Sequence, residues 1–190
     1  TGHSVIVLDA QRIGFGASGR NGGQLGSGQR LDQRDLQKMV GNEYAKLLWE
    51  LAEESKATAV SLIKEHGIDC ALKPGIAHFG FNEKDMRDIH EEAEFLFQNY
   101  GYSQYHPLGK EEGETICPSP VYHGGAIDRG AFHLHPLRLA LGLAKAAEAA
   151  GVKIYENSEV IAVDQGSDTR VMTSTGRVTC ENVVLACNGY

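Results

Sequence analysis

The stretch that decides the fold is residues 5–28, VIVLDAQRIGFGASGRNGGQLGSG, in which a short apolar run ends at an acid and leads into a glycine-rich loop. Residues 5–8 contain three β-branched side chains, which is typical of a strand in a parallel sheet covered on both faces. Seven of the fifteen residues from 14 to 28 are glycine. This order of strand, acid and glycine loop predicts the start of an α/β domain.

The glycine loop is also the most basic part of an acidic chain. Residues 10–31 carry three arginines and no acid, whereas the whole chain has 18 Lys and Arg against 25 Asp and Glu, a net charge of −7. Glycine lets a backbone approach a ligand closely, and N–H groups at the start of a helix bind phosphate. We therefore expect an anion-binding loop, with Ser18, Asn21 and Gln24 as side-chain donors. A plain surface loop is the alternative.

Asp9 follows the apolar run directly. In a dinucleotide-binding fold, the acid that closes the second strand accepts hydrogen bonds from the adenosine ribose. Acids after strands are also common as turn residues, so Asp9 alone leaves both interpretations open. The glycine loop that follows in the right order favours the ribose role.

The composition narrows the class of protein. Hydrophobic residues make up 42% of the chain and charged residues 23%, as in a globular protein. The acidic balance argues against a nucleic-acid partner. There is no apolar stretch of membrane-spanning length and no C-x-x-C pair, so we expect a cytoplasmic protein with no membrane partner. His133 and His135 are two apart without a third ligand placed by the sequence, so we expect no metal site.

Further elements are expected along the rest of the chain. They are a helical region over 32–66 broken at Gly41, two short strands over 68–81 turning at 74–75, a helix over 83–100 capped by Asn82, a strand at 121–127 within an otherwise irregular 102–135, a helix over 136–150, strands at 152–156 and 159–164, a hairpin over 169–180, and a strand at 183–186. The order predicts an α/β domain, residues 1–66 and 133–190, interrupted by an α+β insertion, residues 67–132.

Several of these stretches carry a family resemblance. VIVLDAQRIG at 5–14 and ASGRNGGQL at 17–25 resemble the D-amino-acid oxidase-like family of FAD-dependent oxidoreductases, and within it the γ-glutamylputrescine oxidoreductase branch. LHPLRLALGLA at 134–144, EVIAV at 159–163 and VVLACNG at 183–189 are similar to later parts of the same family. The resemblance implies a partial FAD-binding Rossmann-like (doubly wound) domain that lacks its first strand, with an inserted α+β segment of the substrate domain.

The resemblance also implies which residues hold FAD, namely Asp9, Ala10, Gln11, Arg12, Ser18, Gly19, Arg20, Asn21, Gly22, Gly23, Gln24, Leu25, Val160, Ala186, Cys187 and Gly189. Among these, Asp9 would bind ribose, Arg12 and residues 18–23 the diphosphate, and Gln24 and Leu25 would lie near the flavin ring. The family more often has Glu where this chain has Asp9, and frequently has Thr at the position of Cys187.

The reaction that the resemblance implies is hydride transfer from an amine carbon to FAD. The resulting imine hydrolyses to aldehyde and ammonia, and γ-glutamylputrescine is the candidate amine. A D-amino-acid, glycine or sarcosine oxidase, and a non-catalytic nucleotide-binding relic, are the alternatives. No residue of this chain is identified as catalytic.

The family's G-x-G-x-x-G turn, which comes about 25–30 residues before the acid, is not in this sequence. We therefore expect an internal fragment that needs the N- and C-terminal parts of the same polypeptide and binds FAD weakly or not at all by itself. A tight, yellow 1:1 FAD complex of the isolated 190-residue chain would contradict this expectation.

Overall fold

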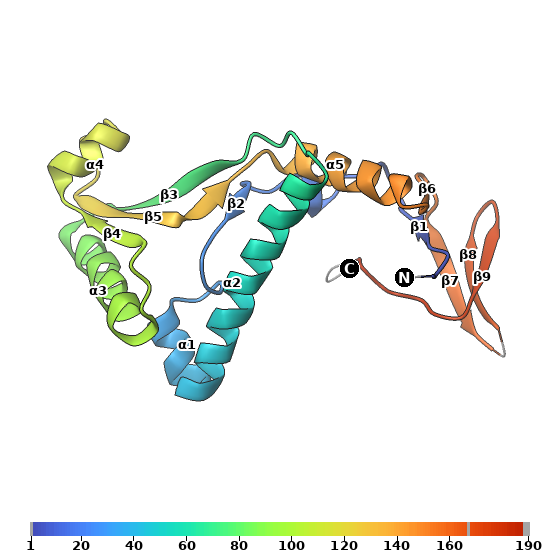
Figure 1. Cartoon of the computed structure of the whole chain (residues 1–190), viewed down its shortest axis with the longest axis horizontal. Coiled ribbons are helices and arrows are strands. Elements are labelled where there is room, and N and C mark those ends of the chain that lie inside the picture. Colours follow the sequence, from blue (N-terminus) through green and yellow to red (C-terminus); the bar gives the residue numbers. More distant parts are fainter. Residues whose placement is uncertain (1, 167, 188–190) are drawn as a thin grey trace. The chain divides into compact units, whose positions relative to one another are not determined.

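The computed structural model describes residues 2–166 and 168–187, which form a mixed α/β protein (Figure 1). The α/β class expected from the sequence is confirmed. The chain divides into two compact units: unit 1 joins residues 1–20 to 137–190, and unit 2 is residues 21–136. None of the helices in the described part of the chain has both the length and the apolar character needed to cross a membrane.

Unit 1 contains the parallel strand pair that positions Asp9. β1 (Ile6–Leu8) pairs with β6 (Lys153–Tyr155) in parallel, with Ile6 opposite Lys153. The helix α5 (Pro136–Ala149) precedes β6 and begins at a proline, whose missing N–H costs nothing at that position. The strands expected at 5–8 and 152–156 and the helix expected at 136–150 are confirmed to within two residues.

A second sheet in unit 1 is a three-stranded antiparallel meander. It consists of β7 (Val160–Gln165), β8 (Thr169–Thr173) and β9 (Arg177–Cys180), in that order. The predicted hairpin turn is confirmed, because Thr173 N donates to Gly176 O at 2.9 Å.

The strand expected at 183–186 is wrong. Residues 182–186 have no strand geometry, and Val184 and Leu185 are 86% and 78% exposed. None of the described strands pairs with this segment, so its apolar residues do not form a ladder.

Unit 2 is built on one long strand, β5 (Gly124–His133), which pairs antiparallel with three others. β3 (Lys73–Gly80) runs beside β5 along most of its length, as the pair of long ribbons in Figure 1 shows. The two shorter partners lie at different ends of β5: β2 (Gln24–Leu25) pairs with residues 132–133 and β4 (Tyr105–Leu108) with residues 125–128.

β3 corrects one expectation, since residues 68–81 do not form two strands with a turn at 74–75. A single strand continues through Pro74 and Gly75, and its register against β5 shifts between Pro74 and Ile76. Gly75 has a φ of 92°, so the glycine serves a β-bulge instead of a reverse turn.

The segment 102–135 is more regular than expected. β4 and the helix α4 (Lys110–Ile116) were not predicted, and β5 is longer than the strand expected at 121–127. β4 includes Pro107. Because proline cannot donate a backbone hydrogen bond to a neighbouring strand, its presence argued against a strand here. Gly113 similarly weakens the helical signal of α4, but a Cβ there would press against the Phe79 ring at 3.1 Å.

The helices of unit 2 agree with the sequence. The helical region breaks at Gly41 into α1 (Gln33–Val40) and α2 (Asn42–Glu65), and Gly41 has a φ of 82° that favours glycine. α3 (Glu83–Tyr100) begins after Asn82 and ends at a left-handed Gly101. The helices and the sheet share a core that includes Ala45, Trp49, Ile76, Ala93, Leu96, Ala126 and Ala131, all buried.

Candidate functional site

Asp9 is held at the carboxyl end of β1 by hydrogen bonds on both sides of its backbone. Its N–H donates to Tyr155 O at 3.0 Å, and its carbonyl accepts from Ser158 N at 2.8 Å. One carboxylate oxygen, Oδ1, accepts from Gln11 N at 2.8 Å, whereas Oδ2 has no partner among the described residues. The side chain is half-buried and has acceptor capacity left for a ligand hydroxyl.

The turn after Asp9 is tied to the segment that follows β6. Asn157 N donates to Gln11 O at 3.0 Å, and Glu156 Oε1 accepts from Ile13 N at 2.7 Å. Sequence reasoning missed Glu156, although an acid directly after the second parallel strand was the available signal. Since the carboxyl ends of parallel strands meet at one edge of a sheet, Asp9 and Glu156 lie at the same edge.

Two arginines of this loop are available to an anion. The Arg12 side chain is exposed and has no ion pair or hydrogen bond with the described residues. The Arg20 guanidinium lies 4.2 Å from the centroid of the Phe15 ring, which is itself 48% exposed. A cation held over an aromatic face keeps its N–H donors free for a second partner.

The glycines of the loop have two different roles. A Cβ on Gly19 would lie 2.0 Å from Gly14 O, and a Cβ on Gly14 would lie 2.6 Å from Leu137 Cδ1, so both serve close packing. A Cβ on Gly16 or Gly22 would meet nothing within 4 Å. These two therefore leave open space over the backbone, as an approaching ligand requires.

The N–H groups differ in the same way. Ala17–Gly19 form one 3-10 turn, in which Gly19 N donates to Gly16 O and Arg20 N to Ala17 O, each at 3.2 Å. Other N–H groups of unit 1 have no hydrogen-bond partner within the described ranges, among them those of Arg12, Gly14 and Gly16. Free N–H groups, two arginines and a carboxylate are the donor and acceptor set that a nucleotide diphosphate with its ribose needs.

Residues 21–25 belong to unit 2 and are built into its sheet. Asn21 Oδ1 accepts from Gly23 N at 2.8 Å, and Leu134 N donates to Gly23 O at 2.8 Å. Gly23 is buried with a φ of 69°, while the Gln24 side chain next to it is exposed. The sequence therefore located a structured turn here, with Gln24 as its accessible polar group.

The remaining predicted cofactor residues lie farther along unit 1. Ala10 and Gln11 are exposed beside Asp9, and Val160 is 40% exposed at the start of β7, two residues after Ser158. Ala186 and Cys187 are exposed and outside any strand. Gly189 lies outside the described residues. The structure thus brings the 9–20 segment and the start of β7 together through the bond from Ser158 to Asp9.

A partly buried chain of hydrogen bonds in unit 2 was missed by sequence reasoning. Tyr102 OH donates to Asp128 Oδ1 at 2.6 Å and lies 2.6 Å from Ser27 Oγ, which accepts from Lys56 Nζ at 2.7 Å. Lys56 Nζ also lies 2.8 Å from Glu53 Oε2. Burial, and then the hydrogen bond to Asp128, raise the pKa of Tyr102 well above its ordinary value.

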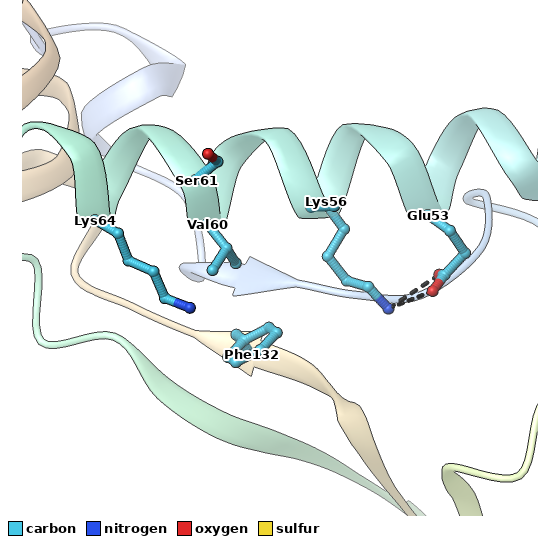
Figure 2. A pocket seen from close by; sticks show the side chains of 7 residues that line it. Glu53, Lys56, Val60, Ser61, Lys64 and Phe132 are labelled. Carbon is cyan, nitrogen blue, oxygen red and sulfur yellow. Dashed lines mark hydrogen bonds and ion pairs between the residues drawn. The ribbon is translucent and has the colours of Figure 1, made fainter.

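Two cavities of unit 2 adjoin this chain. A groove of about 350 Å³ is lined by Lys56 and Lys64 of α2 and by Phe132 of β5. In Figure 2 the Lys64 side chain extends toward Phe132, whereas the Lys56 ammonium is bonded to Glu53. A second cavity of about 340 Å³ is lined by Ser27 and Asp128, which both belong to this series of hydrogen bonds.

The same unit contains a buried ion pair between α1 and α3. Glu92 accepts from Gln33 N at 2.8 Å and from Arg34 Nε at 2.7 Å, and Arg34 also contacts the exposed Glu91 at 3.0 Å. Partial burial lowers the pKa of Arg34, but the hydrogen bonds to Glu92 and Glu91 outweigh it and raise the pKa overall.

His133 has a structural contact, because its Nδ1 lies 2.8 Å from Gly75 O. Within the described ranges, no group of three or more His, Cys, Asp or Glu residues is arranged to hold a metal ion.

Comparison with known proteins places these features in context. The family model for FAD dependent oxidoreductases matches residues 1–190. The chain is 36% identical over 191 residues to a probable oxidoreductase OrdL of Rhizobium meliloti, covering 100% of this chain and 45% of the relative. It is 35% identical over 189 residues to gamma-glutamylputrescine oxidoreductase of Escherichia coli, covering 100% of this chain and 44% of that protein.

Solved structures show the same likeness. The crystal structure of glycine oxidase from Geobacillus kaustophilus superposes with a TM-score of 0.74 at 25% identity, covering 97% of this chain and 48% of that chain. The chain spans less than half the length of these relatives.

Proposed function

Since this chain belongs to the FAD-dependent oxidoreductase family, we propose that the protein containing it oxidises an amine with FAD as the cofactor. When bound, FAD supplies the hydride acceptor, and the protein supplies orientation and electrostatics. The amine loses a hydride from the carbon next to nitrogen, and water hydrolyses the imine to aldehyde and ammonia.

The observation that carries the proposal is the half-bonded Asp9 carboxylate at the end of β1, beside a loop with two arginines and unbonded N–H groups. In this proposal Asp9 binds the ribose, and Arg12 with the open backbone at Gly16 binds the diphosphate. Gln24 lies toward the flavin ring. The proposal concerns the whole protein, because this chain matches 44–45% of the length of the two relatives.

γ-Glutamylputrescine is the proposed substrate. The support for it is the 35% identity to gamma-glutamylputrescine oxidoreductase of Escherichia coli over 189 residues. A glycine, sarcosine or D-amino-acid oxidase is the second candidate, because glycine oxidase of Geobacillus kaustophilus shares the fold of 97% of the chain.

The cofactor is tested by releasing and identifying the flavin of the purified protein. We expect FAD, and we expect Arg12→Ala and Asp9→Ala each to weaken FAD binding by about tenfold, since each removes a charged contact to the nucleotide. Lys84→Ala is the matched control, because the Lys84 side chain is 76% exposed and, within the described part of the chain, forms an ion pair with Asp88 alone. Unchanged FAD affinity in both loop variants would exclude the proposed cradle.

The substrate is tested by anaerobic mixing of the FAD-loaded protein with candidate amines. Reduction of the flavin by γ-glutamylputrescine faster than by glycine, sarcosine or D-alanine supports the first candidate, and the reverse order supports the second. A protein that binds FAD but is reduced by none of them is not an amine oxidoreductase of this type.

A further inference from the structure

The second cavity of unit 2 is lined by polar, aromatic and aliphatic side chains, and its volume of about 340 Å³ lies in the range of small-molecule sites. It lies between the segment 24–33 and the sheet, with Trp49 and Tyr105 among its walls. Its lining has three carboxylates, those of Asp32, Glu92 and Asp128, against one guanidinium, that of Arg30. Acceptors therefore outnumber cationic donors in this cavity.

Asp128 is the carboxylate of greatest interest, because it is 5% exposed and has no direct cationic partner among the described residues. Its Oδ1 accepts from two neutral donors, Tyr102 OH at 2.6 Å and Gly130 N at 3.0 Å. Oδ2 has no hydrogen-bond partner among the described residues. Burial of a carboxylate without a paired cation is costly, so a cation that enters the cavity gains a strong contact.

Gln33 supplies an independent observation at the same cavity. The residue is 3% exposed and lines the cavity, and its Nε2 donates to Ala45 O at 2.8 Å. Among the side-chain nitrogen and oxygen atoms of the described residues, its Oε1 is the one that is fully buried without a hydrogen-bond partner. A buried acceptor of this kind requires a donor to satisfy it.

From these contacts we propose that the cavity binds the primary ammonium group of an aliphatic amine, with Asp128 as its direct partner. An ammonium has three donors and no acceptor, which matches an acceptor-rich lining. The Trp49 and Tyr105 rings favour a cation near their faces. Arg34 neutralises Glu92 from outside the lining and Asp32 is exposed to solvent, so Asp128 remains the buried carboxylate whose charge the ligand balances.

This inference rests on the proposed amine oxidation and specifies which group of the substrate unit 2 recognises. The probes are n-butylamine, which is cationic at neutral pH, and its neutral and anionic counterparts, n-butanol and butyrate. We expect butylamine to bind the purified flavoprotein and change the emission of Trp49, the one tryptophan among residues 1–190. Butanol and butyrate should bind at least about tenfold more weakly.

Asp128→Asn keeps an oxygen for Tyr102 and removes the charge, so it should weaken butylamine binding at least about tenfold. Glu94→Gln is the matched control: it removes a carboxylate that is exposed on α3, and binding should stay at the wild-type value. Equal loss in both variants, or no loss in Asp128→Asn, overturns the proposal. If Asp128→Asn does not fold, the comparison of butylamine with butanol on the wild type decides, and equal affinity overturns it.

The outcome for this site can be separated from the outcome for the proposed function. Butylamine binding that depends on Asp128, in a protein whose flavin no amine reduces, retains the site and refutes the reaction. Reduction by an amine with an unchanged apparent dissociation constant in Asp128→Asn retains the reaction and refutes the site.

Discussion

Gly19 packs its backbone directly against that of Gly14, so closely that a Cβ on residue 19 would lie 2.0 Å from the Gly14 carbonyl oxygen. The contact closes the loop that follows β1 on itself. The atoms that a Cβ on residue 19 would meet belong to the Gly14 backbone, so no flexible side chain can move aside. We expect Gly19→Ala to lower the free energy of unfolding by about 2 kcal/mol, as overpacking does. Urea unfolding followed by circular dichroism measures the change, and a variant as stable as the wild type would show that the loop can open freely.

Gly22 is the contrasting position, because a Cβ there would meet nothing within 4 Å. Gly22→Ala should leave the free energy of unfolding within about 0.5 kcal/mol of the wild-type value. If the open backbone is there for the diphosphate, the same variant should bind FAD more weakly, because a methyl group occupies the approach. Titration of the flavin-free protein with FAD measures this, and equal affinity would mean that the open space serves no ligand.

Glu92 and Glu91 form a matched pair, since both contact Arg34 but their side chains are 10% and 64% exposed. Glu92→Ala leaves Gln33 N and Arg34 Nε without their shared, largely buried acceptor and should cost about 3 kcal/mol. Glu91→Ala removes an exposed partner and should cost less than about 1 kcal/mol. Denaturant unfolding of both variants provides the comparison. Equal losses would mean that burial does not determine the strength of this ion pair.

The sequence was sufficient for the elements whose signals are local. Gly41 and Gly101 mark helix ends because their positive φ favours glycine, and Asn82 marks a helix start because its side chain accepts a backbone N–H. The sequence was insufficient where pairing with a strand far along the chain determines the structure. β3 passes through Pro74 and Gly75 because β5 supplies a partner on both sides of the bulge, and a local reading sees only a turn dipeptide.

The candidate site divides in the same way. Asp9 and the glycine loop were predicted from their order along the chain, and the structure places Asp9 at a parallel strand end. Glu156 contacts Ile13 across 143 residues, and Tyr102 contacts Asp128 and Ser27 from a segment with no motif. The partners in such contacts depend on tertiary packing; the one local signal among them is that Glu156 directly follows a strand.

Asn82 tests the local part of that account. Its Oδ1 accepts from Asp85 N at 2.9 Å, and the Asp85 carboxylate in turn accepts from Phe81 N at 3.2 Å and Asn82 Nδ2 at 2.9 Å. Asn82→Ala should lower the free energy of unfolding by about 1 kcal/mol. Asp85 N loses its acceptor, and the Asp85 carboxylate, which accepts from Phe81 N, loses the hydrogen bond from Asn82 Nδ2. Asn82→Ser, which keeps a capping oxygen and adds no charge beside the Asp85 carboxylate, should recover part of the loss in a thermal melt. No difference between the two variants would assign the effect to something other than the cap.

Tyr102 makes the stability of unit 2 sensitive to alkaline pH. Its pKa in the folded protein is raised above 10.0 by burial and by Asp128, so the unfolded chain loses this proton first as the pH rises. The stabilisation is therefore complete below pH 10.0 and declines as the pH rises further toward the folded pKa. Tyr102→Phe should cost about 1 kcal/mol at neutral pH through the lost hydrogen bond and should make the decline above that pH shallower. The 65% exposed Tyr44, changed to Phe, is the control and should alter neither quantity. Urea unfolding across this pH range measures both effects, and an unchanged alkaline slope in Tyr102→Phe would show that another group causes the decline.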